Sequence, residues 1–191
     1  HGLTIVEDDV FAAFEPEQSV RMAVLDGLER VIRIGSFSKT LSSSIRCGYV
    51  AGTPALIEAL ADLQVATGFT GPGPIATSTI RAVLLGGGYR KHLDQLRRRL
   101  ARARRDTADR LAPLGITPWL MPRGGYSLWC RLPDGVDATR MARTALDLGM
   151  LLAPGDIFSV SGTAGGFMRV NVTQMPYPVA YDAMARAMDG G

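Results

Sequence analysis

Residues 30–52 read RVIRIGSFSKTLSSSIRCGYVAG, and they determine how the rest of the sequence is interpreted. Two short apolar runs, which predict strands, enclose a segment made largely of small and hydroxyl-bearing residues. That segment carries Lys39, with Ser36 and Ser38 close by and Arg46 seven positions farther along. A lysine on a solvated surface needs none of these neighbours. We therefore interpret the segment as the loop of a binding site.

A third apolar run, LTIVEDD at residues 3–9, lies upstream and ends at two carboxylates. With the runs at 30–39 and 46–52, it gives three candidate strands that deliver polar residues at their C-terminal ends. Such strands predict an α/β fold, with a mostly parallel sheet and a site at that edge. Asp8 would reach the site from a neighbouring strand.

Helices are expected after the third strand. Residues 53–67 predict a helix with Thr53 as its N-cap, and residues 75–85 predict a second helix that ends at glycines. Residues 89–111 predict a third helix, in which the arginines and His92 occupy a solvated face. Its apolar stripe recurs at helical spacing and comprises Leu93, Leu96, Leu100, Ala103, Thr107 and Leu111.

The remaining sequence predicts a strand–turn–strand unit, a helix, two short strands and a last helix. This order of elements is typical of an α+β layer. We therefore predict two domains. Residues 1–87 would form the C-terminal part of a larger α/β domain, and residues 88–191 a small α+β domain.

The composition, with 47% hydrophobic and 20% charged residues, is that of a globular protein, and no apolar run is long enough to cross a membrane. The net charge of +3 comes mostly from the arginines of residues 89–111. No aromatic residues interleave with those arginines, so the chain itself does not predict a nucleic-acid site. Cys47 and Cys130 lie in apolar runs without metal-ligand spacing, which predicts reduced core thiols in a cytoplasmic protein.

The loop around Lys39 carries the groups that pyridoxal 5'-phosphate requires. The aldehyde of this cofactor needs a lysine for a Schiff base, and its phosphate needs hydroxyls, backbone N–H groups and an arginine. Ser36, Ser38 and Arg46 can supply the phosphate ligands. The pyridine nitrogen needs a carboxylate, such as Asp8, that keeps the ring protonated as an electron sink.

Three motifs in this order resemble the fold-type I pyridoxal-phosphate-dependent aminotransferases of the aspartate aminotransferase superfamily: VEDDVF at 6–11, SFSKTLSSSIR at 36–46 and FMRVNV at 167–172. The branch that they resemble holds the aminoadipate and kynurenine aminotransferases and the aminotransferase-like domains of MocR-type GntR regulators. The resemblance runs along the whole chain and covers the second half of the family fold.

The resemblance implies a role for each site residue. Lys39 would be the Schiff-base lysine and proton shuttle, and Asp8 would pair with the pyridine nitrogen. Arg169 would bind the carboxylate of an amino acid or a 2-oxo acid. The phosphate would be held by Ser36, Ser38 and Arg46. A homodimer is also implied.

Two departures from the family pattern affect these expectations. Phe11 occupies a cofactor-binding position where the family usually has a tyrosine that donates to the phenolate oxygen. Transamination is therefore expected to be weaker, unless a tyrosine from elsewhere substitutes for it. The family's phosphate loop, stacking aromatic and neighbouring asparagine would precede this segment. The chain begins without a methionine and enters an apolar run within three residues. We therefore expect a piece of a longer protein.

Several residues allow other interpretations. Asp9 competes with Asp8 for the pyridine nitrogen. Arg169 could pair with a buried acid instead of a ligand, and Arg131, in a similar strand, is its rival for the carboxylate. The GFTGPGP segment at 68–74 is either a plain linker or a loop that approaches the cofactor of a partner subunit.

Two functional hypotheses follow. The first is the effector-sensing module of a MocR-type regulator, in which DNA is bound only through a domain outside this chain. The second is a free-standing aminotransferase that transfers an amino group between an amino acid and a 2-oxo acid. Phe11 and the arginine-rich helix favour the regulator, because a sensor tolerates weaker catalysis.

Overall fold

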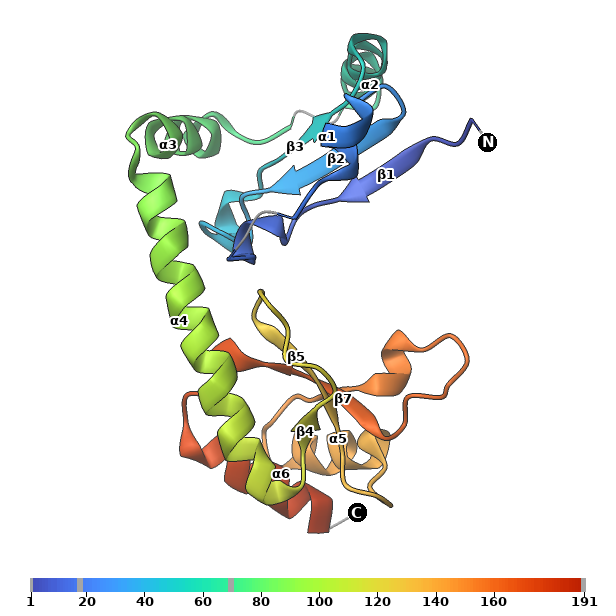
Figure 1. Ribbon diagram of the computed structural model, residues 1–191, viewed down its shortest axis with the longest axis vertical. Helices are drawn as coiled ribbons and strands as arrows, with labels where there is room; N and C mark the ends of the chain where they lie inside the picture. The colour runs from blue at the N-terminus through green and yellow to red at the C-terminus, as the bar shows by residue number, and fades with distance from the viewer. Residues whose placement is uncertain (1, 17–18, 69–70, 190–191) are drawn as a thin grey trace. The chain divides into compact units, whose positions relative to one another are not determined.

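The computed structural model describes residues 2–16, 19–68 and 71–189 (Figure 1). The chain divides into two compact units, His1–Leu96 and Arg97–Gly191. Helix α4, Gly88–Leu111, contributes residues to both units. The two-domain division at residue 88 stays a prediction.

The first unit contains a three-stranded sheet made of β1 (Ile5–Asp8), β2 (Val31–Ser36) and β3 (Gly48–Ala51), in that order. This sheet and its helices confirm the expected α/β class. Strand β2 runs parallel to β1, whereas β3 runs antiparallel to β2. The expectation that all three strands deliver their C-terminal ends to one edge is therefore wrong for β3. A connection of eleven residues leads from β2 to β3, too short for the crossover that a parallel pair needs.

Helix α1 (Met22–Asp26) packs against β2 on one face of this sheet. The Glu7 carboxylate holds its first turn, because it accepts bonds from the backbone N–H groups of Met22 (2.9 Å) and Ala23 (3.1 Å). These bonds hold the pKa of Glu7 below its usual value, and the bond from Ala23 has the largest effect. Partial desolvation of the carboxylate opposes them. Ala23 and Val31 are buried in this layer.

Two helices follow the sheet, α2 (Pro54–Ala66) and α3 (Pro74–Leu85). Both helices were predicted, and the predicted N-cap of α2 is confirmed: the Thr53 hydroxyl accepts a bond from the N–H of Leu56 at 3.3 Å. No residue of α2 is buried, whereas α3 buries Ile80. The short 3-10 turns of this unit are Ala12–Phe14 and Ser43–Ile45.

Helix α4 has the predicted apolar stripe, with Leu100, Thr107 and Leu111 buried. One expectation about its polar residues is wrong. Arg104 is buried, not solvated, because its guanidinium donates to the carbonyls of Gly125 and Arg123. His92 is exposed, as predicted, and its Nε2 also lies 2.7 Å from the carbonyl oxygen of Thr40.

The second unit contains an antiparallel sheet in the order β4-β5-β7-β6. The strands are Thr117–Pro118, Ser127–Arg131, Phe167–Asn171 and Ala153–Pro154 in that order. Helices α5 (Ala138–Asp147) and α6 (Pro178–Asp189) contact each other, and 3-10 turns lie at Ala112–Leu114, Gly155–Phe158 and Val172–Gln174. The expected α+β layer is therefore present. Its core includes Leu128, Cys130, Met141, Met168 and Met184.

Both cysteines are buried and free, as predicted. Burial raises the pKa of the Cys130 thiol to about 12, so this thiol is protonated at neutral pH. Among the described helices, none is long and apolar enough to cross a membrane.

Candidate functional site

The sheet of the first unit brings the predicted site residues to one edge. Asp8 ends β1 and Ser36 ends β2, and the two strands are parallel, with Asp8 in register with Ile34. Strand β3 begins at this same edge, because Gly48 pairs with Ser36 in the antiparallel register. The reversal of β3 thus places Arg46, which precedes it, at the edge where β1 and β2 end.

Residues 37–47, here called the lysine loop, connect β2 to β3 and carry Lys39 at an exposed position. The loop is closed at its base, where the N–H of Phe37 donates to the carbonyl of Cys47 at 3.0 Å. The Ser36 hydroxyl accepts a bond from the N–H of Ser38 at 3.1 Å. A local turn follows, in which the N–H of Leu41 donates to the Phe37 carbonyl at 2.9 Å. These bonds give the loop a defined path from one strand to the next.

Arg46 has a backbone conformation that L-residues seldom adopt. Its φ is 48°, in the left-handed region, where it ends the 3-10 turn Ser43–Ile45. A non-glycine residue held there costs of order 1 kcal/mol or more, and such residues concentrate at functional sites. The side chain is exposed, and no ion pair found in the described ranges includes Arg46. Its guanidinium can therefore take an anionic ligand.

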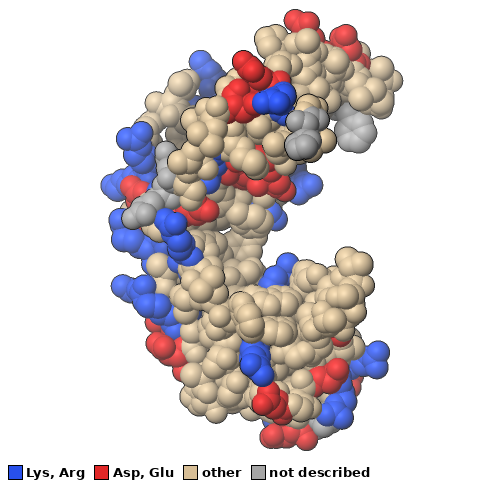
Figure 2. Space-filling model, turned by 45° about the vertical axis from the view of Figure 1, so that its right-hand side comes forward, with Lys and Arg blue, Asp and Glu red and all other residues tan. Residues whose placement is uncertain are grey.

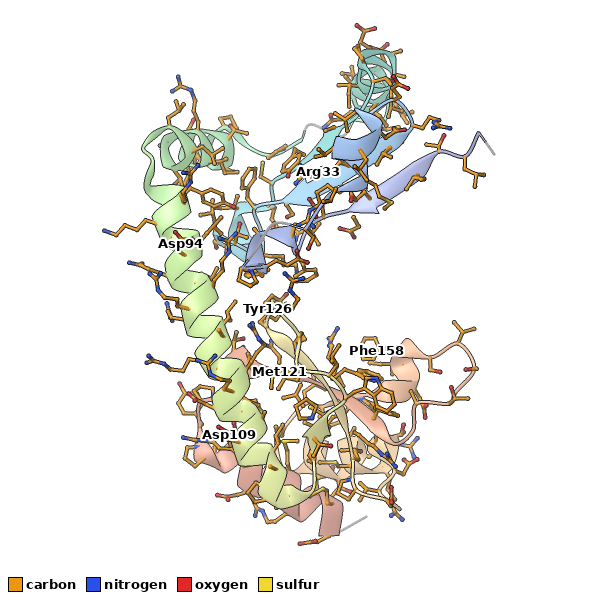
Figure 3. All side chains as sticks on the ribbon, viewed as in Figure 1. Arg33, Asp94, Asp109, Met121, Tyr126 and Phe158 are labelled. Atoms are coloured by element: carbon orange, nitrogen blue, oxygen red, sulfur yellow. The ribbon has the colours of Figure 1, made fainter. Side chains whose placement is uncertain are left out.

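Asp8 and Asp9 differ in what their carboxylates already hold. The Asp9 side chain is only 7% exposed, and its two oxygens pair with Arg21 (3.0 Å) and Arg33 (2.8 Å). Asp8 is exposed and accepts one bond, from the N–H of Val10 at 3.2 Å. Figure 3 labels Arg33 on the sheet of the first unit. Of the two carboxylates, Asp8 has the greater capacity for a further partner.

Phe11 follows β1 and is half exposed. Its ring lies 6.0 Å from that of Phe14, centroid to centroid. This position supplies no hydroxyl for a ligand, so any contact that it makes with a bound group is apolar.

Sequence reasoning missed the contacts of Thr40, the residue after the lysine, with Tyr89 and His92. Thr40 is buried, with its hydroxyl oxygen 2.9 Å from the Tyr89 hydroxyl and its carbonyl oxygen 2.7 Å from His92 Nε2. Tyr89 and His92 lie about fifty residues away in the sequence, so nothing local linked them to Lys39. The spacing of three between them, which places both on one helix face, was the available hint.

Arg169 lies on β7 in the second unit and is exposed. Its guanidinium carbon lies 4.6 Å above the centroid of the Phe158 ring, which is labelled in Figure 3. No carboxylate of the described chain forms an ion pair with Arg169, so the alternative of a buried pair is wrong. Its rival Arg131 is engaged, since it pairs with Asp134 at 3.1 Å.

A pocket of about 940 Å³ lies beside Arg169 within the second unit. Arg169 is the one charged residue among those that line it. The others are apolar or neutral, and include Leu151, Ile157 and Tyr177. The pocket thus combines one cation with apolar walls.

Two further expectations concern the surface. On the face drawn in Figure 2, basic side chains line the left edge with a few acidic ones among them, and the absence of a nucleic-acid site stays a prediction. The predicted 68–74 loop lies partly outside the described residues, because residues 69 and 70 are not described.

Comparisons with known proteins agree on one family. A family model for aminotransferase class I and II matches residues 1–181. An uncharacterized HTH-type transcriptional regulator, YisV of Bacillus subtilis, is 31% identical over 82% of this chain and 33% of its own length. Aromatic-amino-acid aminotransferase 1 of Thermococcus litoralis is 29% identical over 92% of this chain and 43% of its own length.

A solved structure has the same fold. The α-aminoadipate aminotransferase LysN of Thermus thermophilus, complexed with N-(5'-phosphopyridoxyl)-L-leucine, matches 99% of this chain with a TM-score of 0.79 and 26% identity. The match covers 51% of the LysN chain. This chain therefore spans between a third and a half of the length of these relatives.

Proposed function

Because the chain belongs to the family of class I and II aminotransferases, we propose that its lysine loop forms part of a pyridoxal 5'-phosphate site. The observation that carries the proposal is the placement of Asp8, Lys39 and Arg46 at one edge of the first sheet. LysN, with the same fold, is solved with a phosphopyridoxyl amino acid.

The chemistry of this edge fits the cofactor. Arg46 presents a guanidinium without an ion pair in the described chain, and Ser36 and Ser38 carry hydroxyls close to Lys39 in the sequence. These groups suit a phosphate dianion. Asp8, with one accepted bond, suits a protonated ring nitrogen. When bound, the cofactor supplies an electron sink for a carbanion at the α-carbon of an amino acid.

Each residue then has a defined task. The Lys39 amine would hold the cofactor through its aldehyde carbon and would also move a proton at the α-carbon of the ligand as a general acid–base. Asp8 keeps the ring nitrogen protonated. Ser36, Ser38 and Arg46 hold the phosphate, and Phe11 makes an apolar contact where a hydroxyl donor is absent.

Arg169 is assigned to the carboxylate of an amino acid or 2-oxo acid ligand. Its guanidinium is exposed, is steadied by the Phe158 ring and is not engaged by an acid in the described chain. A planar guanidinium binds a carboxylate through two parallel hydrogen bonds. We assign the same contact to either ligand, because both carry this carboxylate.

We infer that the whole protein is a MocR/GntR-type transcriptional regulator in which this chain senses a small effector. Two observations support this role: a regulator is among the relatives at 31% identity, and Phe11 removes a hydroxyl from the site. The proposal includes a cytoplasmic homodimer that binds DNA only through a domain outside this chain. A free-standing aminotransferase is the second candidate, favoured by the unpaired guanidinium of Arg169 and by the relative from Thermococcus litoralis.

Lysine modification provides a direct test of the site. The chain has two lysines, Lys39 and Lys91, so each can be examined by a single substitution. After incubation of the full-length protein with pyridoxal 5'-phosphate and reduction with borohydride, mass spectrometry should find the cofactor on Lys39. The Lys39→Ala variant should lose this adduct, whereas Lys91→Ala, altered at an exposed position of α4, should keep it. An adduct that persists in Lys39→Ala on this chain would refute the assignment.

A second experiment separates the regulator from the enzyme. The loaded full-length protein is mixed with single amino acids and a 2-oxo acid acceptor, and both turnover and DNA binding are measured. A regulator should change its DNA affinity on addition of an amino acid without multiple turnovers. Sustained conversion to product without any DNA binding would instead identify an aminotransferase.

A further inference from the structure

Thr40, the neighbour of Lys39, is the most firmly anchored residue of the lysine loop. It is only 3% exposed. Its N–H donates to the Phe37 carbonyl at 3.3 Å, and its hydroxyl oxygen lies 2.9 Å from the Tyr89 hydroxyl. Its carbonyl oxygen lies 2.7 Å from Nε2 of His92, which donates this bond. All three polar groups of the residue that follows the lysine are therefore bonded.

The two distant partners come from the first turns of α4. Tyr89 and His92 are three residues apart and so lie on one face of the helix. The Tyr89 ring also meets the Phe37 ring edge-on, with 6.2 Å between centroids. Phe37 is the residue whose N–H closes the loop on Cys47. Helix α4 thus holds the lysine loop at its base and immediately after the lysine.

We propose that Tyr89 and His92 are positioning residues that act through Thr40 to fix the backbone from which Lys39 projects. The inference rests on the proposed function of Lys39 and extends it to residues that do not touch the cofactor. In the covalent step, the amine adds to the aldehyde carbon, both amine protons leave with the aldehyde oxygen as one water, and a carbon–nitrogen double bond remains.

The physical reason is orientation. The lysine side chain is long and exposed, so its own contacts restrict it little. A fixed backbone at its root limits the volume that the amine explores and raises the fraction of time in which it can attack. A reacting group that is misplaced by about 1 Å can lose on the order of a hundredfold in rate.

The test measures the rate at which full-length apoprotein forms the Lys39 adduct after it is mixed with pyridoxal 5'-phosphate, using borohydride quenching and mass spectrometry. Tyr89→Phe and Thr40→Val each remove one hydroxyl, and we expect each to slow the reaction roughly tenfold. Thr40→Ser, which keeps the hydroxyl, should restore most of the rate. His92→Gln, which keeps an N–H donor, should react faster than His92→Leu.

Pyridoxamine 5'-phosphate distinguishes positioning from a general loss of structure. It carries the same phosphate and ring but no aldehyde, so its affinity should stay within about twofold of the wild-type value in every variant. Thr79→Val, at an exposed threonine of α3, serves as the matched control and should change neither quantity.

Unchanged rates in both Tyr89→Phe and Thr40→Val would overturn the proposal. A fall in pyridoxamine 5'-phosphate affinity as large as the fall in rate would overturn it too, because the bonds to Thr40 would then support the whole site. If the wild-type protein forms no adduct on Lys39, the proposed function fails and the positioning role fails with it. That outcome is distinct from one in which the wild-type protein forms the adduct and the variants form it at the same rate.

Discussion

Asp8 and Asp9 are adjacent and chemically identical, yet they have different environments. Alternation along an extended chain directs them to opposite sides of the sheet. Asp9 lies on the side where Arg21 and Arg33 meet its two oxygens. Asp8 lies on the other side, where its carboxylate accepts a bond from the N–H of Val10. The ion pairs of Asp9 therefore leave Asp8 as the better candidate for a ring nitrogen.

Arg46 tests the phosphate assignment at the scale of one residue. Arg46→Ala should weaken pyridoxal 5'-phosphate binding by about 1.5–3 kcal/mol, the contribution of hydrogen bonds to a charged group. Binding of pyridoxal, which lacks the phosphate, should not change. Titration of the full-length protein with each compound gives both dissociation constants. Arg81→Ala, an exposed arginine on α3, is the control, and an equal loss for both compounds in Arg46→Ala would contradict the assignment.

Among the elements, α4 shows how one helix serves two purposes. Its first turns bond the lysine loop through Tyr89 and His92, within the first unit. Farther along, Arg104 donates to the carbonyls of Arg123 and Gly125, within the second unit. Burial lowers the pKa of Arg104, and the neighbouring charge of Arg105 lowers it further. The buried guanidinium of Arg104 is stabilised because it donates hydrogen bonds to backbone carbonyls of a turn.

Arg104→Met should destabilise the protein by about 2 kcal/mol, because the turn carbonyls lose charged donors while the apolar part of the side chain is kept. Arg105→Met, on the exposed face of the same helix, should stay within about 0.5 kcal/mol of the wild type. Urea unfolding monitored by circular dichroism measures both values. Similar midpoints for the two variants would show that the bonds of Arg104 contribute nothing.

At the scale of the whole molecule, the first sheet exposes apolar side chains on the face opposite α1. Helix α1 lies on the face of Glu7 and Val31. On the opposite face Val6 is 57% exposed and Val50 is 44% exposed. Apolar sheet surface of this kind marks an interaction site. The chain spans a third to a half of its relatives' lengths.

Residues 1–191 studied alone should therefore self-associate through this face. Sedimentation velocity over a range of concentrations should show a rising mean mass. Substitution of both Val6 and Val50 by threonine should lower that mass, because it replaces apolar contacts with hydroxyls. Val160→Thr, at a fully exposed loop position of the second unit, should leave it unchanged. A wild-type chain that stays monomeric at all concentrations would contradict this prediction.

The sequence by itself determined the local features. Strands β1, β2 and β3, helices α2 to α6 and the Thr53 cap follow from apolar periodicity, β-branched runs and capping residues, which act over a few positions. Lys39 could be singled out for the same reason, because its serines and Arg46 lie within eleven positions, at the end of β2 and in the connection that follows it. The motifs at 6–11, 36–46 and 167–172 also indicated the family, because they combine residues that bind one cofactor and its ligand.

The tertiary structure alone decided what depends on distant contacts. The antiparallel pairing of β3 placed Arg46 at the same edge of the sheet as Asp8. The ion pairs with Arg21 and Arg33 distinguished Asp9 from Asp8. The bonds from α4 to Thr40 join residues about fifty positions apart. Helical spacing could not show that Arg104 is buried, because the carbonyls that it bonds come from a turn elsewhere in the chain. Periodicity reports which face of an element is apolar, whereas only the folded chain decides which groups meet there.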